Sequence, residues 1–480
     1  MKTLLVLPPG GFLTESEHMM PPLGLAYLAA ILEQNEKKVE ILDAHVEGLS
    51  WKDLHKKLVG SNPDIIGVTF TTETRFDGFK TIKIAKTALP NSTIIAGGPH
   101  VSLTAEDTLR HIPELDIIVR GEGENTLLNL INALESKGDF KSVQGISYRE
   151  NGKIKNNPPE PFIENLDTIP FPARHLLPMD KYNFNVDVPG KGNLPFTSIM
   201  TSRGCPFGCC FCATSEVWGR RFRGRSPQNV IDEIEFVINK YKVKGIWFFD
   251  DTFTLNKKRT REICDLIIKK GLDISWFCDV RVDGMDKNLL KKMKDAGCYS
   301  IAYGVESGSQ RILDEVIGKK IELNQVKNVA KWSREVGIHP RGLFILSLPT
   351  ETYAEAKITI EFMRELGGEN SINILKIYPG NEVENIARGS GILPEDFSWA
   401  TKHDQNIPSL PSVIGNAPIF IDKLTWEEIG DLLFEFAELQ EYSIYKRIPG
   451  AIKNIKSYND LTMLMSLLKA YLKRKIRADN

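Results

Sequence analysis

Short apolar runs alternate with amphipathic segments along most of the chain, and this alternation limits the folds open to it. In the first part, five apolar runs occupy residues 3–9, 39–44, 64–70, 93–99 and 116–124. Segments with the periodicity of one-sided helices lie next to them, at residues 23–35, 51–61, 76–89, 105–112 and 125–136. Strands without alternating polar residues are buried on both faces of a sheet. The pattern therefore predicts a doubly wound parallel α/β sheet over residues 1–140.

Unusual residues follow these apolar runs. Ligands of doubly wound sheets bind beyond the carboxyl ends of the strands, where glycines let a ligand approach the backbone. The candidate contacts are Asp43, Thr69, Thr71, Gly97, Gly98, Pro99, His100, Gly121 and Gly123. Two other interpretations stay open: the glycines only turn the chain, or the site takes a nicotinamide or flavin dinucleotide. The first loop, Pro8-Pro9-Gly10-Gly11, lacks the G-x-G-x-x-G motif of dinucleotide sites.

Proline clusters mark residues 141–194 as a linker, with a small hairpin expected at Asn151-Gly152. From residue 195 to 390 the alternation resumes, and six strands are expected, at residues 196–202, 245–251, 274–282, 300–307, 342–349 and 372–380. A closed eightfold barrel takes about 250 residues. The pattern therefore predicts an open, partial (β/α)6 barrel with its chemistry at the carboxyl ends of the strands.

Residues 391–480 are expected to form a helical C-terminal region, with helices over 424–448 and 460–476. The second helix ends in Lys473, Arg474, Lys475 and Arg477, which either complement the helix dipole or contact an anionic membrane. At the other end, the apolar run is too short for a secretory signal, and no run reaches the roughly 18 residues of a membrane span. We therefore expect a cytoplasmic protein without a transmembrane segment. The net charge of -1 provides no field that would recruit nucleic acid.

Four of the seven cysteines fall within residues 205–212, after the first predicted barrel strand. Disulfides between such close neighbours would be strained, and no second C-x-x-C pair completes a zinc site. Cys205, Cys209 and Cys212 form the pattern C-x3-C-x2-C. Three thiolates can hold a four-iron, four-sulfur cluster and leave one iron open to another ligand. Cys210 either points away or is a spare ligand. The isolated cysteines are expected to be buried apolar residues: Cys264, Cys278 and Cys298.

This loop, with Phe211 before its third cysteine, resembles that of the radical S-adenosylmethionine superfamily. Five later segments resemble sequence blocks of the cobalamin-binding branch of that superfamily: RFRGRSPQNVIDEI, FFDDTFT, YGVESGSQRIL, LSLPTET and YPGNE. Three segments of the first domain are similar to the same branch: PPLGLAYLAAIL, GGPHVSLTAEDTL and VRGEGE. The resemblance extends to about residue 390 and implies a Rossmann-like cobalamin-binding domain followed by a radical S-adenosylmethionine barrel.

The resemblance also implies roles for individual residues. The [4Fe-4S] cluster would be bound by Cys205, Cys209 and Cys212, and its open iron would take the amino and carboxylate groups of S-adenosylmethionine. Further contacts with S-adenosylmethionine would come from Phe211 at the adenine, Glu306 and Ser307 at the methionine or ribose, and from Asp250 and Arg281. For Arg281, a contact with the carboxylate and a structural ion pair are both open.

The sequence departs from the family pattern at two strand ends. Asp250 and Asp251 stand where many members carry a Gly-Gly-Glu motif. Ser347 and Thr350 stand where related sequences usually have glycine, which would narrow the pocket.

For the first domain, the resemblance implies cobalamin at the sheet edge, with its nucleotide tail running past Thr69 to Thr72 and Gly97 to His100. The segment DAHVEG, residues 43–48, fits the D-x-H-x-x-G pattern of histidines that bind cobalt. In proteins with that pattern the motif follows the first strand, whereas here it follows the second. We therefore expect His45 to be a solvated loop histidine, with cobalt ligation as the alternative.

Together these features predict an enzyme that uses cobalamin and a 5'-deoxyadenosyl radical to methylate an unactivated carbon. One alternative is a radical oxidative cyclase without methyl transfer, and another is a sensor or carrier that binds both cofactors without turnover. The expected partners are a small-molecule or lipid-like substrate and a flavodoxin- or ferredoxin-type electron donor.

Overall fold

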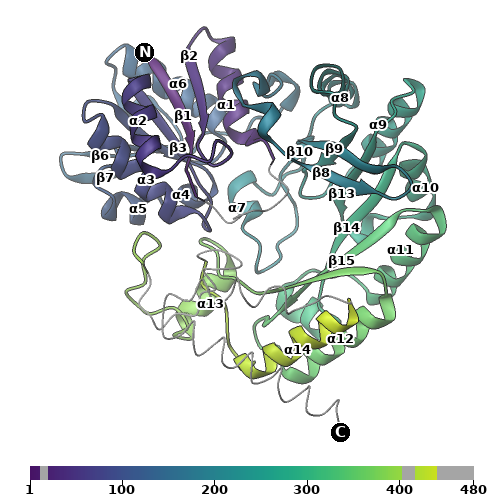
Figure 1. Cartoon of the computed structure of the whole chain (residues 1–480). Coiled ribbons are helices and arrows are strands. Elements are labelled where there is room, and N and C mark those ends of the chain that lie inside the picture. The colour runs from purple at the N-terminus through teal and green to yellow at the C-terminus, as the bar shows by residue number, and fades with distance from the viewer. Residues whose placement is uncertain (11–19, 403–416, 441–480) are drawn as a thin grey trace. The chain divides into compact units, whose positions relative to one another are not determined.

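In the computed structural model, which describes residues 1–10, 20–402 and 417–440, the chain divides into two units (Figure 1). The first unit consists of Met1–Cys205, Thr214–Trp247 and Ser398–Lys402. The second contains Pro206–Ala213 and Phe248–Phe397, together with the described residues of the C-terminal part. Each unit is therefore assembled from segments that are separated in the sequence.

A seven-stranded sheet of order β2-β1-β3-β4-β5-β6-β7 organises the first unit. Its parallel strands are β1 (Lys2–Leu7), β2 (Lys38–Asp43), β3 (Ile65–Thr69), β4 (Thr93–Gly97) and β5 (Ile117–Val119). Each coincides with a predicted apolar run, so the doubly wound sheet is confirmed. The strand order reverses between β1 and β3, and sheets of this kind bind ligands at such a switch point.

Helices cover both faces of this sheet, because neighbouring residues of a buried strand point to opposite faces. The face with Leu5, Ile65 and Ile95 packs against α1 (Leu23–Gln34) and α6 (Gly123–Glu135). The opposite face carries Leu4, Ile66 and Ile94. It is covered by α2 (Trp51–Ser61), α3 (Arg75–Ala88), α4 (Pro99–Leu103) and α5 (Ala105–His111) (Figure 1).

The expected hairpin at Asn151-Gly152 is present, and it extends the sheet. Its strands, β6 (Ile146–Glu150) and β7 (Lys153–Asn156), are antiparallel to each other, and β6 is antiparallel to β5. Both turn residues have positive φ, as a tight hairpin turn requires. The segment that the proline clusters marked as a linker therefore begins as part of the first sheet.

A short segment from late in the chain also belongs to the first unit. The carbonyl of Trp399 accepts a hydrogen bond from Arg75 Nε at 2.9 Å, and Ala400 belongs to the apolar core that also contains Phe79. Asp107 accepts a hydrogen bond from the Trp399 amide at 2.8 Å. Residues 398–402 thus complete a core whose other members come from the first 118 residues.

The part of the first unit that follows the sheet contains two antiparallel pairs. The hairpin of β8 (Asn185–Val188) and β9 (Gly192–Ile199) comes first, and β10 (Ser202–Arg203) then pairs with β11 (Arg223–Gly224). Two helices accompany them, α7 (Thr214–Trp218) and α8 (Pro227–Tyr241). Ser226 caps α8 by accepting a hydrogen bond from the Asn229 amide.

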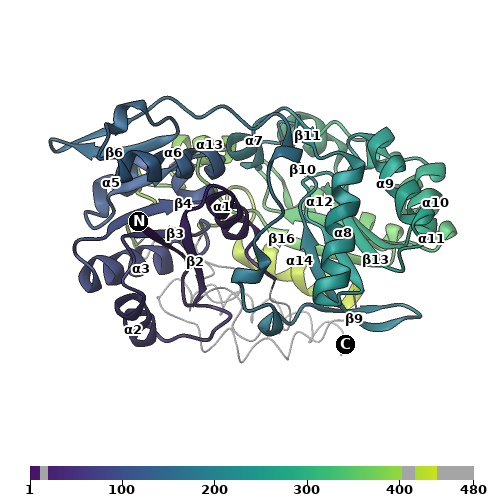
Figure 2. The ribbon, with the colours of Figure 1, turned by 90° about the horizontal axis from the view of Figure 1, so that it is seen from above.

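The second unit contains parallel strands that alternate with helices. The strands β13 (Ser275–Val280), β14 (Cys298–Glu306), β15 (His339–Leu346) and β16 (Glu369–Ile374) pair in this order. The helices are α9 (Lys257–Lys269), α10 (Lys287–Asp295), α11 (Leu323–Val336) and α12 (Tyr353–Leu366). Figure 2 shows α9, α10 and α11 side by side. With β9 and β12 (Gly245–Phe248), all six predicted barrel strands are present.

The described C-terminal residues pack on the second unit. Helix α13 (Glu382–Gly389) follows β16, and α14 (Trp426–Leu439) packs on α12. Thr425 and Glu428 form a capping box that begins α14 within the predicted helix 424–448. The predicted helix 460–476 and its basic end lie outside the described residues. In the described part of the chain, no helix is long and apolar enough to cross a membrane.

Candidate functional site

The cysteine loop begins at a backbone position that only glycine fits. Gly204 has a φ of +86°, and a Cβ added to it would lie 2.2 Å from the carbonyl oxygen of Arg221. The amide of Cys205 donates a hydrogen bond to the carbonyl of Gly219 at 3.2 Å. The direction in which the chain enters the loop is thus fixed by backbone contacts.

The cysteines that follow differ in burial. Cys209 and Cys212 are partly exposed, and the Cys212 amide donates to the Cys209 carbonyl at 3.0 Å. Cys210 is buried, its amide donates to the Ile317 carbonyl, and burial together with nearby Glu382 raises the pKa of its thiol to about 12. This difference favours the interpretation in which Cys210 points away from a cluster.

Charged side chains gather around Cys209 in the second unit. The Arg281 guanidinium lies 3.5 Å from the ring centre of Phe207 and donates to the carbonyl of Lys319 at 3.0 Å. Lys319 Nζ in turn lies 2.6 Å from Glu306 Oε1. Burial raises the pKa of the Cys209 thiol, and the charges of Lys319 and Arg281 act in the opposite direction.

Lys319 was not among the predicted site residues, although its neighbours were. It follows a π-helical turn (η6, Ile312–Ile317) that ends at Gly318 with a φ of +70°. Such turns are rare and occur frequently at functional sites. A π-helical turn leaves no periodic signal in the sequence, so a lysine beside it looks like any surface lysine. Arg281 also pairs with Asp283 at 2.9 Å, so the structural ion pair considered for it is present.

The residues at the end of β14 are held firmly. Glu306 has a φ of +71°, a conformation that is uncommon outside glycine. Ser307 is fully buried, and its hydroxyl lies 3.3 Å from Thr359 Oγ1 and accepts a hydrogen bond from the Ser309 amide. The Ser307 hydroxyl is thus engaged within the protein, and its predicted contact with S-adenosylmethionine stays a prediction.

Ser347 and Thr350, after β15, have φ values of +65° and +61°. This backbone explains why related sequences would carry glycine there. Glu351 holds the turn, because its Oε2 accepts hydrogen bonds from the amides of Ser347 at 2.8 Å and Leu348 at 3.2 Å. Its Oε1 is buried and has no hydrogen-bond partner within the described part of the chain, and burial raises the pKa of the carboxyl to about 8. Sequence reasoning missed Glu351.

The remaining predicted residues of the barrel lie as follows. Phe211 is partly exposed, and its carbonyl accepts a hydrogen bond from Asn381 Nδ2 at 2.7 Å. Asp250, directly after β12, is buried, whereas Asp251 is exposed. The isolated cysteines are buried as predicted: Cys264, Cys278 and Cys298.

In the first unit, Asp43 is engaged by protein groups. Tyr182 Oη donates to its Oδ2 at 2.7 Å, and the Val46 amide donates to its Oδ1 at 3.0 Å. Burial raises the pKa of Asp43, while these hydrogen bonds act to lower it. His45 lies in the turn that Asp43 organises and is partly exposed, as expected for a loop histidine. Nothing in the sequence pattern connects Asp43 with Tyr182.

The loops after β3 and β4 are also bonded to each other. Thr72 Oγ1 lies 3.0 Å from His100 Nδ1, and the imidazole is fully buried near Phe70 and Trp399. Burial lowers the pKa of His100 well below its ordinary value, so the ring is neutral. Gly98 has a φ of +103° and lies too close to Thr69 and to the Phe70 backbone to carry a side chain. The neighbouring predicted residues lie at the strand edge: Thr71 in the turn after β3, Gly97 at the end of β4, and Pro99 at the start of α4.

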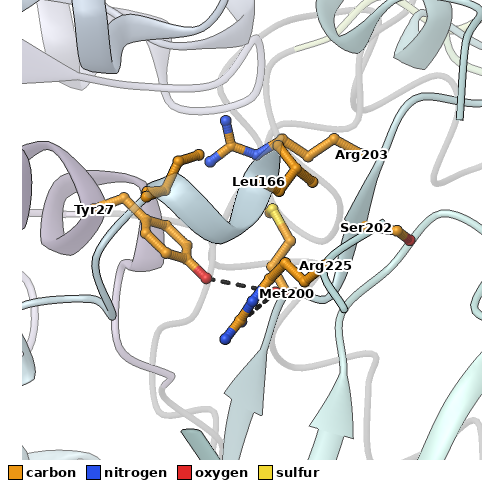
Figure 3. A pocket seen from close by; sticks show the side chains of 7 residues that line it. Tyr27, Leu166, Met200, Ser202, Arg203 and Arg225 are labelled. Carbon is orange, nitrogen blue, oxygen red and sulfur yellow. Dashed lines mark hydrogen bonds between the residues drawn. The ribbon is translucent and has the colours of Figure 1, made fainter. Parts of the chain in front are cut away.

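The loop after β5 places carboxylates, rather than only glycines, at the sheet edge. Gly121, with positive φ, and Gly123 alternate with Glu122 and Glu124, whose side chains are buried. Arg203 Nη2 lies 2.5 Å from Glu124, and Arg223 Nη1 lies 2.8 Å from Glu122. Arg203 also lines a small pocket of the first unit with Tyr27 and Met200 (Figure 3).

The residues of the cysteine loop suit the [4Fe-4S] cluster that the sequence implies. Among the described residues, no three His, Cys, Asp or Glu side chains form a site for one metal ion. A [4Fe-4S] cluster needs no such convergence, because each thiolate binds a different iron. Thiols of Cys209 and Cys212 that are partly exposed, beside the cations Lys319 and Arg281, suit an anionic thiolate cluster.

Comparison with known proteins adds independent observations. Residues 199–363 match the model of the radical SAM superfamily, and residues 11–131 match that of the B12 binding domain. An uncharacterized methyltransferase of Pyrococcus horikoshii is 43% identical over 400 residues, which cover 82% of this chain and 84% of that protein. An anaerobic magnesium-protoporphyrin IX monomethyl ester cyclase of Rubrivivax gelatinosus is 32% identical over 352 residues, covering 72% of this chain and 62% of that protein.

A solved structure has the same fold. The radical S-adenosylmethionine methyltransferase TsrM from Kitasatospora setae, with cobalamin and a [4Fe-4S] cluster bound, superposes with a TM-score of 0.73. The similarity covers 98% of this chain and 100% of that chain, at 16% sequence identity.

Proposed function

Because the chain belongs to the family of radical S-adenosylmethionine enzymes with a cobalamin-binding domain, we propose that it methylates an unactivated carbon of its substrate. The reaction would use two molecules of S-adenosylmethionine. One provides the methyl group and leaves as S-adenosylhomocysteine. The other accepts one electron and gives methionine and a 5'-deoxyadenosyl radical, which takes a hydrogen atom from the substrate and leaves as 5'-deoxyadenosine.

The joint match of one chain to both domain families carries this proposal. A radical domain alone fits many reactions, and a cobalamin domain alone fits methyl transfer without radicals. The combination of the two domains, together with a relative named as a methyltransferase at 43% identity, favours radical methylation over other radical reactions and over methyl transfer without radicals.

The cluster would be held by Cys205, Cys209 and Cys212, and when bound it supplies the single electron, while cobalamin relays the methyl group. Arg281 and Lys319 would offset the negative charge of the thiolates, since both influence Cys209. Cys210, buried as a neutral thiol, would stay outside the ligand set.

For S-adenosylmethionine, the proposed contacts are Phe211, Asp250, Arg281, Glu306 and Ser307. Since the Ser307 hydroxyl is bonded to Thr359 and to its own loop, Ser307 would offer its backbone. The strained backbone φ of Glu306 supports a role in ligand binding, because strained residues are concentrated at active sites and ligand-binding sites.

For cobalamin, the proposed contacts lie at the carboxyl edge of the first sheet: Asp43, Thr69, Thr71, Gly97, Gly98, Pro99, His100, Gly121 and Gly123. The side chains of Asp43 and His100 are already bonded to Tyr182 and Thr72. The side chains of these two residues would therefore hold the loops of the site in place. The polar contacts with cobalamin would come from the glycine backbone and the threonine hydroxyls.

The substrate would be a small or lipid-like molecule. Each turnover would take two electrons from a flavodoxin- or ferredoxin-type donor. One electron cleaves S-adenosylmethionine to give the radical, and the other is needed because the methyl group leaves its S-adenosylmethionine as a cation before it is joined to the substrate radical. A cluster that must be reduced requires a reducing compartment, which supports a cytoplasmic location for the enzyme.

The proposal is tested with protein purified without oxygen, after rebuilding of the cluster and addition of hydroxocobalamin, S-adenosylmethionine and a chemical reductant. Both 5'-deoxyadenosine and S-adenosylhomocysteine should form, and the corrinoid should co-elute with the protein. Cys209→Ala should lose 5'-deoxyadenosine formation, whereas Cys210→Ala should retain it. Failure to bind a corrinoid, or an unchanged yield with Cys209→Ala, would contradict the proposal.

A second candidate is a radical oxidative cyclase, favoured by the relative that is 32% identical and named as a cyclase. Such an enzyme would form 5'-deoxyadenosine without S-adenosylhomocysteine. The ratio of the two products therefore separates the candidates.

A further inference from the structure

The cysteine loop is bounded by two buried arginines that face each other. Arg203 in β10 pairs with Arg223 in β11 in the register of an antiparallel ribbon. Both are only 4% exposed. Two like charges directly opposite each other in a β-ribbon destabilise the fold, and a buried charge without a counter-charge destabilises it even more. Residues 204–222, which contain all three predicted cluster ligands, are therefore closed at their base by a contact that requires counter-charges.

The counter-charges come from the loop after β5. Glu122 accepts hydrogen bonds from Arg223 Nη1 at 2.8 and 2.9 Å and lies 3.2 Å from Arg203 Nη1. Glu124 Oε1 lies 2.5 Å from Arg203 Nη2. Two carboxylates and two guanidinium groups thus form a neutral, buried cluster.

Neighbouring groups fix the geometry of this cluster. The Arg203 guanidinium lies 5.0 Å from the ring of Trp218, and Arg223 lies 4.8 Å from that of Phe162. Arg223 also donates to the carbonyls of Ile163 at 2.9 Å and Trp218 at 2.8 Å. Figure 3 shows Arg203 beside Tyr27 of α1, whose ring lies 5.6 Å from the guanidinium. Arginines that bind several acceptors at once and lie against aromatic rings are not interchangeable with lysine.

We propose that Glu122 and Glu124 are positioning residues that fix the base of the cysteine loop and so place Cys205 for cluster binding. Arg203 stands two positions before Cys205, the Gly204 backbone between them lies against the Arg221 carbonyl, and the Cys205 amide donates a hydrogen bond to the Gly219 carbonyl at 3.2 Å. Any movement of Arg203 is therefore passed on to Cys205. The inference rests on the proposed role of Cys205, Cys209 and Cys212 as cluster ligands.

The proposal also assigns a role to the VRGEGE segment that sequence reasoning did not give it. Its glycines were predicted to contact a cofactor, yet its two carboxylates bind the arginines that bracket the cysteines. The domain that matches the B12 binding family would thus take part in building the iron-sulfur site.

The test compares Glu122→Gln/Glu124→Gln with Asp116→Asn in the full chain. Asp116 is a matched control, because it also binds a cation, Lys86 at 2.9 Å, and a backbone amide in the same unit, away from the loop base. Hydrogen exchange of the cluster-free proteins is followed by mass spectrometry, and iron per chain is measured after anaerobic rebuilding. The double variant should exchange at least tenfold faster in residues 202–205 and 219–224, and bind at least fivefold less iron. Asp116→Asn should change neither, whatever its effect on the melting temperature.

Unchanged exchange at the loop base, or full iron content in the double variant, would overturn the proposal. If the double variant does not fold, Glu124→Gln alone, which leaves Glu122 between the two arginines, should show the same effects at smaller size. If the wild-type chain binds no more iron than Cys209→Ala, the cluster assignment fails instead. The exchange measurement then still decides whether the carboxylates hold the loop base.

Discussion

The strand ends of the two units turn the chain in different ways. After β4 and β5 of the first sheet, residues with positive φ are glycines, Gly98 at +103° and Gly121 at +70°. After β14 and β15 of the barrel they are Glu306 at +71°, Ser347 at +65° and Thr350 at +61°. A side chain in this conformation costs roughly 1 kcal/mol or more.

This difference shows where the molecule tolerates strain. Non-glycine residues with positive φ persist when the surroundings over-determine them, and they cluster at active sites. In the barrel, the same strand ends hold the Glu306–Lys319 pair and the buried Glu351. In the first sheet, Asp43 and His100 are bonded to other protein groups, and the turns themselves are relaxed. The barrel edge thus combines strained backbone with buried charged groups, whereas the turns of the first edge are made by glycines.

The largest expected effect is on the charged pair of the barrel edge. Lys319→Met should destabilise the protein by about 3 to 5 kcal/mol, because it leaves the Glu306 carboxylate buried without its partner. Urea denaturation of the cluster-free protein measures this loss. The double variant Lys319→Met/Glu306→Gln should recover at least half of it. A loss below about 1 kcal/mol for Lys319→Met would mean that the pair is not desolvated.

Next in size is a change at the relaxed edge. Gly98→Ala should cost about 3 kcal/mol, since its Cβ would lie 2.8 Å from Thr69 Oγ1 and 2.9 Å from the Phe70 carbonyl at positive φ. Gly121→Ala is the control, because Gly121 also has a positive φ but an added Cβ would meet none of the described residues within 4 Å, and it should cost only about 1 kcal/mol. Equal losses in thermal denaturation would show that crowding at Gly98 is unimportant.

Glu351 should make the barrel edge sensitive to pH. Its folded-state pKa of about 8 lies above the value of about 4.5 expected when unfolded, so its stabilising contribution is complete below the lower value and is lost as pH rises through the higher one. Relative to Glu351→Gln, the wild type should lose about 2 kcal/mol between about pH 5.5 and pH 7.

The neighbouring Glu355 provides the control with the opposite sign. Its hydrogen bond with Arg311 lowers its pKa to about 2, so its contribution is present at neutral pH and is lost only as pH falls below about 4.5. A pH-independent difference between wild type and Glu351→Gln in denaturation would show that Glu351 is ionised at all these pH values.

The smallest expected effect is a gain. Thr350→Gly should stabilise the protein by about 0.5 kcal/mol. Glycine removes the steric cost of a side chain at positive φ, and this gain is slightly larger than the free energy lost because glycine raises the conformational entropy of the unfolded chain. Thr350→Val, which keeps the strain, should not stabilise. If Thr350→Gly instead lowers the melting temperature, contacts of the threonine side chain stabilise the turn after β15 by more than the positive φ destabilises it.

Most of the fold follows from local patterns in the sequence. The eleven predicted strands are present because buried parallel strands such as Ile65–Thr69 are written as short apolar runs. The pattern missed β10 and β11, which have two residues each and are too short to show a period. It also assigned residues 146–156 to a linker, because polar residues and prolines surround that edge hairpin.

The partners of the site residues were beyond prediction for a different reason. Periodicity reports which residues are buried and not which residues meet. Asp43 and Tyr182 are 139 positions apart, and Arg203 and Glu124 are 79 apart. The cysteine spacing was visible in the sequence because the three predicted cluster ligands lie within one loop. Lys319 and Glu351 went unnoticed because a lysine or glutamate carries no local sign of burial.

The return of residues 398–402 to the first unit has a consequence for engineering this family. Sequence comparison draws a module that ends near residue 131, yet the hydrophobic interior of that module is finished by Ala400 and by the Trp399 carbonyl on Arg75. A gene fragment that stopped before codon 398 would lack Ala400 and the Trp399 carbonyl, and so would leave the apolar core of this module incomplete. When the first domain is exchanged between relatives, the segment that corresponds to residues 398–402 should therefore be exchanged together with it.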